Sequence, residues 1–107
     1  GVEVPNDREG CLQDSHWSGG SFGYFPSYAL GNAYGAQMLH NMEQEFDVFG
    51  QVARGSLSGV TGWLREHVHQ YGQLMEPADI VKNACGKFDP HYYLDYLTRK
   101  YTELYDL

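Results

Sequence analysis

The chain has 107 residues, 42% of them hydrophobic, which suits one domain with a modest core and argues against both two domains and disorder. Seven basic and fourteen acidic residues give a formal charge of −7, so a phosphate backbone would be repelled and nucleic acid is not an expected partner. No apolar run approaches the ~20 residues that a membrane span needs, so no membrane association is expected.

The N-terminus and the cysteines indicate the cellular context. Residues 1–5 lack the basic and apolar regions of a signal peptide, and they lack an initiator methionine, so we expect a fragment or a processed product. Cys11 and Cys85 lie far apart, whereas a small disulfide scaffold would use more cysteines. We therefore expect two reduced thiols in a cytoplasmic protein.

The first quarter of the chain is expected to be irregular. Residues 1–9 are interpreted as an extended lead-in and residues 10–25 as a glycine-rich substrate loop, because glycine lets a backbone turn sharply and approach a ligand. Gln13, His16 and Trp17 lie among these glycines, which favours a binding loop. The alternative is a surface loop with incidental polar content.

Residues 26–107 are expected to be helical, which makes the fold all-α. Apolar residues at helical spacing, proline starts and glycine stops predict helices over 26–45, 47–53, 58–71, 77–86 and 89–105. Gly31 and Gly35 lie four apart on the first of these helices and are interpreted as a site of close helix packing. The apolar face of the last helix, with Tyr93, Leu94, Leu97, Tyr101 and Leu104, is expected to cover the first long helix.

The histidines do not form a metal site by their spacing. His67 and His69 are two residues apart and would point roughly 200° apart on a helix, whereas metal-binding pairs are spaced by three or four. No His-Glu-x-x-His is present, and His40 and His91 are isolated, so all four are interpreted as solvated or capping residues. Ser15, Ser18 and Ser21 flank His16, but their local order matches no nucleophile-elbow geometry.

One constellation could carry chemistry. His16 is followed by Tyr24 and Tyr28 across a glycine hinge that leads into a helix. An imidazole N–H and a phenol O–H are donors that stabilise a developing oxyanion in peptide hydrolysis. Packed aromatic rings would explain the same spacing equally well.

Two motifs resemble those of a known family. The first is Gly10-Cys11-Leu12-Gln13-Asp14-Ser15-His16-Trp17, and the second is Gly23-Tyr24-Phe25-Pro26-Ser27-Tyr28. They resemble the Gly-x-x-Gln-Asp-x-His-Trp and Gly-Tyr-Phe-Pro-x-Tyr elements of the thermostable carboxypeptidase 1 (carboxypeptidase Taq) family. Residues 63–72 and 88–101 are similar to the family's C-terminal part, so the resemblance covers nearly the whole chain.

The resemblance implies a fold and an activity. It implies the helical C-terminal subdomain of a larger, mostly helical metallopeptidase with a deep cleft, which removes single residues from peptide C-termini. The Zn²⁺ ligands of this cytoplasmic, typically homodimeric enzyme would be a His-Glu-x-x-His helix and a later Glu, all outside this chain. The chain alone is therefore expected to bind no metal and to be inactive.

The resemblance also implies roles for particular residues. His16 and Tyr24 match the positions of a His and a Tyr beside the scissile carbonyl, and are the expected catalytic residues. The expected substrate-binding residues are Gln13, Tyr28, Trp17 and Gly23. The alternative function, from another class, is a noncatalytic helical module whose tyrosine-rich faces bind a partner or a dimer mate.

Overall fold

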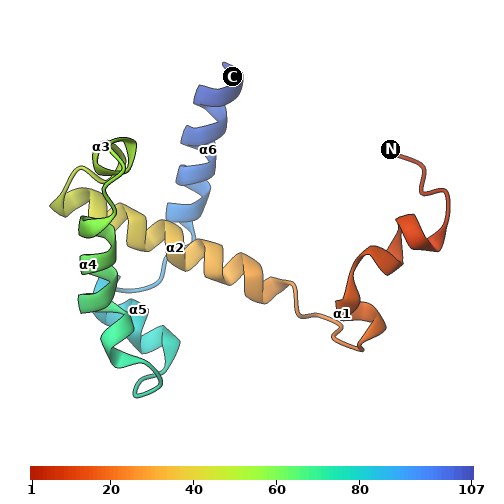
Figure 1. The fold of residues 1–107 in the computed structure, drawn as a ribbon, viewed down its shortest axis with the longest axis horizontal. Helices are drawn as coiled ribbons and strands as arrows, with labels where there is room; N and C mark the ends of the chain where they lie inside the picture. Colours follow the sequence, from red (N-terminus) through yellow and green to blue (C-terminus); the bar gives the residue numbers. More distant parts are fainter. The chain divides into compact units, whose positions relative to one another are not determined.

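The structure, a computed structural model, describes all 107 residues and contains helices and turns but no strand. The helices are α1 Ser15–Ser18, α2 Pro26–Glu45, α3 Val48–Ala53, α4 Ser58–His67, α5 Pro77–Cys85 and α6 His91–Tyr105 (Figure 1). Three short 3₁₀ turns lie at Asp7–Glu9, Cys11–Gln13 and His69–Tyr71. The all-α prediction is confirmed. No helix is long and apolar enough to cross a bilayer.

The chain divides into two compact units, residues 1–30 and residues 31–107, and α2 contributes to both. Each unit is described by itself. The second unit holds the core, which is centred on the buried side chains Met42, Val48 and Trp63. These come from the C-terminal half of α2, from α3 and from α4, and the Trp63 indole donates a hydrogen bond to Glu45 Oε1 at 2.8 Å. The indole N–H is thereby satisfied although its ring is buried.

A fully buried glutamine joins α2 to the turn after α5. Gln37 is 0% exposed, and its side-chain amide nitrogen donates to the carbonyl oxygens of Cys85 at 3.1 Å and Lys87 at 3.0 Å. Its amide oxygen accepts from the backbone N–H of Asp89 at 3.0 Å. Because a buried polar group is stable only when hydrogen-bonded, these three contacts fix the α5–α6 connection against α2.

The start of α6 agrees with the prediction. Asp89 Oδ1 accepts a hydrogen bond from the His91 backbone N–H at 2.9 Å, and Pro90 already has helical angles, φ −66° and ψ −14°. Asp89 therefore caps the helix and Pro90 occupies its first turn, where a missing N–H costs nothing. The predicted helix 58–71 is instead interrupted. Val68, at φ −129° and ψ −62°, separates α4 from the 3₁₀ turn.

The packing expected of α6 is found only in part, since Tyr93 and Leu97 are partly buried at a hollow shared with α2. None of its residues is buried, and Leu94 and Leu104 are 55% and 61% exposed. An added Cβ at Gly31 or Gly35 would meet no atom within 4 Å, so no helix packs closely at these glycines. They line an open hollow with residues of α6 instead. Helical periodicity predicted an apolar face correctly, but it does not say which surface covers that face.

Candidate functional site

Residues 10–25 have more local structure than the predicted loop. Asp14 ends the 3₁₀ turn and caps α1, since its Oδ2 accepts the backbone N–H of His16 at 2.8 Å. Gly20 and Gly23 have φ of +81° and +75°, which other residues adopt only with strain. These two glycines allow the chain to reverse between α1 and α2. The turn brings His16 of α1 against the residues at the start of α2.

The His16 imidazole is held at both nitrogens. Nδ1 lies 2.8 Å from Asp14 Oδ1, and Nε2 lies 3.2 Å from the Tyr28 hydroxyl oxygen. Since a carboxylate only accepts hydrogen bonds, Nδ1 carries the proton. In the neutral ring Nε2 is then the acceptor, and the Tyr28 O–H donates to it. Asp14, His16 and Tyr28 thus form a hydrogen-bonded chain within the first unit.

Aromatic rings surround the same imidazole. Tyr24 stacks on it, with ring centroids 5.3 Å apart and an interplanar angle of 18°. Phe25 and Tyr28 meet it edge-on at 5.3 Å and 5.9 Å. The His16 side chain is 28% exposed, while Tyr24 and Tyr28 are 48% and 54% exposed. The site is therefore an open surface where two phenols and an imidazole can reach a ligand.

The other predicted site residues lie beside this group. Trp17 stacks on Phe22 at 6.3 Å rather than on His16, and it is half exposed. The side chain of Gln13 donates to the Arg8 carbonyl and so ties the lead-in to the site. Gly23 contributes its backbone conformation rather than a contact.

Sequence reasoning missed two residues of the group, Asp14 and Phe25. The sequence did contain a signal for Asp14. An Asp two residues before a His at a helix start can cap the helix and also accept a hydrogen bond from the imidazole. The glycine content of residues 10–23 predicted a loop instead, and a loop offers no helix to cap. Phe25 had no signal beyond its place in the second motif.

The Asp14 carboxylate should remain ionised well into the acid range. The side-chain hydrogen bond from His16 lowers the pKa of Asp14 below its ordinary value of 3.8. Because the folded-state pKa of Asp14 is lowered, the contact with His16 stabilises the fold at pH values above 3.8. This stabilisation is lost as the pH falls through the lowered pKa. We expect ¹⁵N spectra of the imidazole to show Nδ1–H contacting a carboxylate from neutral pH down to about pH 4. Loss of this signal near pH 5 would contradict the geometry.

The chain's own residues do not fit a metal site. No group of three or more His, Cys, Asp or Glu side chains gathers anywhere in the structure. His67 packs on Trp63 at 4.5 Å and His40 packs on Tyr92 at 4.6 Å, so both contact aromatic rings. Burial raises the pKa of the Cys85 thiol to about 11, which keeps it protonated and unreactive at neutral pH.

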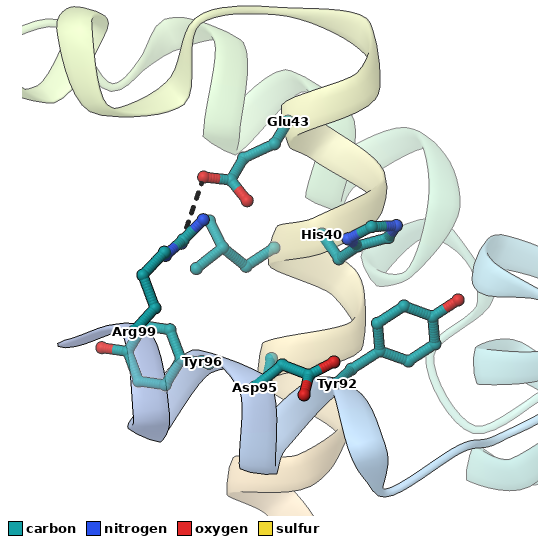
Figure 2. A pocket seen from close by; sticks show the side chains of 8 residues that line it. His40, Glu43, Tyr92, Asp95, Tyr96 and Arg99 are labelled. Atoms are coloured by element: carbon teal, nitrogen blue, oxygen red, sulfur yellow. Dashed lines mark hydrogen bonds and ion pairs between the residues drawn. The ribbon is translucent and has the colours of Figure 1, made fainter. Parts of the chain in front are cut away.

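A second hollow, of ≈ 270 Å³, lies between α2 and α6 (Figure 2). On one side Arg99 reaches Glu43, with Nη2 and Oε1 3.5 Å apart, and on the other the His40 and Tyr92 rings lie together. The hollow continues into the neighbouring surface of α6, which includes the exposed Leu104. It holds no nucleophile and no metal ligand set, so its chemistry suits a contact surface rather than a reaction.

Comparison with known proteins gives consistent matches. A family model described as Carboxypeptidase Taq (M32) metallopeptidase matches residues 1–101. Carboxypeptidase 1 of Bacillus subtilis is 45% identical over 107 residues, and thermostable carboxypeptidase 1 of Thermus thermophilus is 37% identical over 107 residues. Each alignment covers 98% of this chain and 21% of the relative. Thermostable carboxypeptidase 1 of Pyrococcus furiosus is 34% identical over 103 residues, covering 94% and 21%.

A solved structure shares the fold. The structure described as the BsuCP crystal structure matches with a TM-score of 0.86 and 44% sequence identity, over 96% of this chain and 21% of that one. The chain therefore spans about one fifth of the length of the relatives it matches.

Proposed function

The chain belongs to the carboxypeptidase Taq (M32) metallopeptidase family, and we propose that it is the C-terminal portion of a metallocarboxypeptidase. The complete enzyme would hydrolyse single amino acids from peptide C-termini in the cytoplasm. The family match over residues 1–101 and the carboxypeptidase names of three relatives support this proposal. The metal would be Zn²⁺, held by ligands in the remainder of the polypeptide, because no donor set for it exists in this chain.

The observation that carries the proposal is the contact of two phenols with one imidazole. Tyr24 would donate a hydrogen bond to the oxygen that becomes anionic when the scissile carbonyl is attacked, and His16 would donate to the same oxygen from Nε2 once that nitrogen also carries a proton. Tyr24 contacts His16 by stacking, while Tyr28 contacts it by a hydrogen bond. Tyr24 is 48% exposed in this arrangement, so its hydroxyl would be accessible to a substrate oxygen.

The remaining site residues would bind or support the peptide. Tyr28 contacts Tyr24 at the same open face, and Trp17 presents a half-exposed ring that stacks on Phe22. Gln13 would hold the loop in shape through Arg8, and Gly23 would let the backbone pass close to substrate. The chain's part in the reaction is thus to bind, orient and stabilise charge.

Reconstitution tests the proposal. The remainder of the polypeptide is expressed together with this chain, and zinc-dependent release of C-terminal residues from a peptide is measured. We expect the two pieces to co-purify and to be active together, and each piece alone to be inactive. A matched chain carrying His16→Ala should co-purify without restoring activity. Full activity of the remainder alone would contradict the proposal.

A specific observation also favours a contact function for α6. Leu94, Tyr101 and Leu104 are 55%, 41% and 61% exposed on one helix, and apolar side chains exposed together mark an interaction surface. We propose that the remainder of the polypeptide covers this face, since relatives are about five times as long as the chain. A noncatalytic module that uses the face to form a homodimer is the alternative.

Co-purification and light scattering distinguish the two candidates that could cover the apolar face of α6. If the remainder of the polypeptide covers the face, Leu104→Glu should weaken co-purification of the two pieces by at least tenfold and leave the number of subunits in the full-length enzyme unchanged. The matched control is Glu103→Gln on the same helix, which should change neither quantity. If Leu104→Glu instead converts a full-length dimer to a monomer, the face is a dimer contact.

A further inference from the structure

We propose that Phe25 is a positioning residue for the reaction, whose ring holds the His16 imidazole and the Tyr28 phenol in the orientation that the reaction needs. This role rests on the proposed function of His16. The Phe25 side chain has no polar atom, so it can neither donate a hydrogen bond nor carry a proton. Any effect of this side chain on the reaction must therefore pass through the residues that it contacts.

The Phe25 ring contacts both partners of one hydrogen bond. Its centroid lies 5.3 Å from that of His16, with the planes inclined by 69°, and 6.2 Å from that of Tyr28, with the planes inclined by 44°. Inclined rings at centroid separations of about 4.5–7 Å attract each other. One apolar ring thus lies against the two groups that meet at 3.2 Å through His16 Nε2 and the Tyr28 hydroxyl oxygen.

The imidazole needs such contacts because its own torsion does not fix its plane. The χ2 torsion of histidine has a broad energy profile, whereas χ1 has well-separated minima. Tyr24 stacks on the His16 ring at 5.3 Å with the planes 18° apart, and Phe25 lies at the same centroid distance with the planes 69° apart. Since the two rings meet the imidazole at such different inclinations, a rotation about χ2 would lose favourable contact with at least one of them.

The local sequence fixes the place of Phe25 itself. Phe25 immediately precedes Pro26, and a proline disfavours the helical conformation of the residue before it. The Phe25 carbonyl oxygen accepts the backbone N–H of Tyr28 at 3.0 Å, and the Tyr24 carbonyl oxygen accepts that of Ser27 at 3.0 Å. Phe25 is therefore attached to the first turn of α2, the helix that also carries Tyr28. A ring at a helix start can position its neighbours more precisely than a ring on a loop.

Substitutions in the full-length enzyme test this role. Phe25→Leu keeps an apolar side chain but removes the ring. We expect kcat to fall about 10- to 100-fold, with KM within about twofold, because a small misplacement of a functional group can cost about 100-fold in rate. Phe25→Tyr retains the ring and its contacts, so kcat should stay within about threefold of native.

A phenylalanine in the second unit provides the matched control. Phe88 lies edge-on to Tyr34, with centroids 5.0 Å apart and planes 84° apart, so its partner is a phenol rather than an imidazole. Phe88→Leu removes an edge-on aromatic contact of the same kind and should keep native kcat. Metal content should be native in all three variants, since the chain supplies no metal ligand set.

A double substitution tests whether Phe25 acts through His16. If it does, adding Phe25→Leu to His16→Gln should lower kcat by no more than about twofold further, because residues in one network are not additive. Multiplying losses overturn the role, and so does a Phe25→Tyr variant as impaired as Phe25→Leu. Native turnover in Phe25→Leu, or loss of its metal, overturns this role alone. Native turnover in His16→Gln overturns the proposed function and this role together.

Discussion

Replacing Tyr24 with Phe in the full-length enzyme is expected to lower kcat about 10²- to 10³-fold, the usual effect of removing one oxyanion donor. The substitution removes only a hydroxyl. Because the ring that stacks on His16 at 5.3 Å is retained, the imidazole keeps its position. Metal content should be unchanged, since the chain supplies no metal ligand set. Steady-state kinetics and metal analysis of the same preparation measure both quantities.

A tyrosine in the second unit provides the matched control for Tyr24. Tyr105 is 64% exposed and stacks on Tyr101 with centroids 5.8 Å apart, but it contacts no imidazole. Tyr105→Phe therefore removes an exposed hydroxyl from a stacked ring and should keep native kcat. Near-native turnover in Tyr24→Phe would remove its hydroxyl from the reaction, and loss of metal in that variant would show a structural effect instead.

Replacing the buried Gln37 with Leu should have the largest effect on stability. The side chain is 0% exposed, and its loss leaves the Cys85 and Lys87 carbonyls and the Asp89 N–H without their partners. Each buried group left unsatisfied costs about 1–3 kcal/mol. We expect the free energy of unfolding to fall by roughly 3 kcal/mol or more, measured by urea denaturation of the full-length enzyme.

The control for Gln37 lies on the same helix. Gln44 is exposed, and its amide makes one contact of 3.4 Å to the His40 carbonyl. Gln44→Leu should change the free energy of unfolding by no more than about 0.5 kcal/mol, as is usual for surface substitutions. Equal effects at the two positions would show that the buried hydrogen bonds of Gln37 do not hold the α5–α6 connection.

The strongest sequence signals predicted the helices well. Pro26 and the apolar spacing after it predicted α2 with the observed bounds, and Asp89-Pro90 predicted the start of α6. Both signals are local, because they depend on a fixed φ or a cap rather than on tertiary contacts. The four-residue α1 lies below the length at which periodicity can be read, and its glycine-rich surroundings predicted a loop.

The contacts between elements were harder to predict. The sequence motif joined His16, Tyr24 and Tyr28, but which phenol stacks and which donates depends on a turn at Gly23 and on side-chain rotamers. Gln37 gave no sign of burial, because glutamine is usually exposed and its partners lie about fifty residues away. The apolar face of α6 was predicted to cover α2. Helical periodicity shows only that this face is apolar, and it does not identify the surface that contacts it.

The central claim is that His16 and Tyr24 stabilise an oxyanion that exists only in the transition state. Binding of a phosphonate peptide, whose tetrahedral anionic group imitates that state, tests the claim in the full-length enzyme. Tyr24→Phe should weaken phosphonate binding by the same factor as kcat/KM, about 10²- to 10³-fold. The same substitution should leave unchanged the affinity for a substrate-like peptide that carries no tetrahedral anionic group. Equal weakening of both ligands, or of neither, would contradict the account.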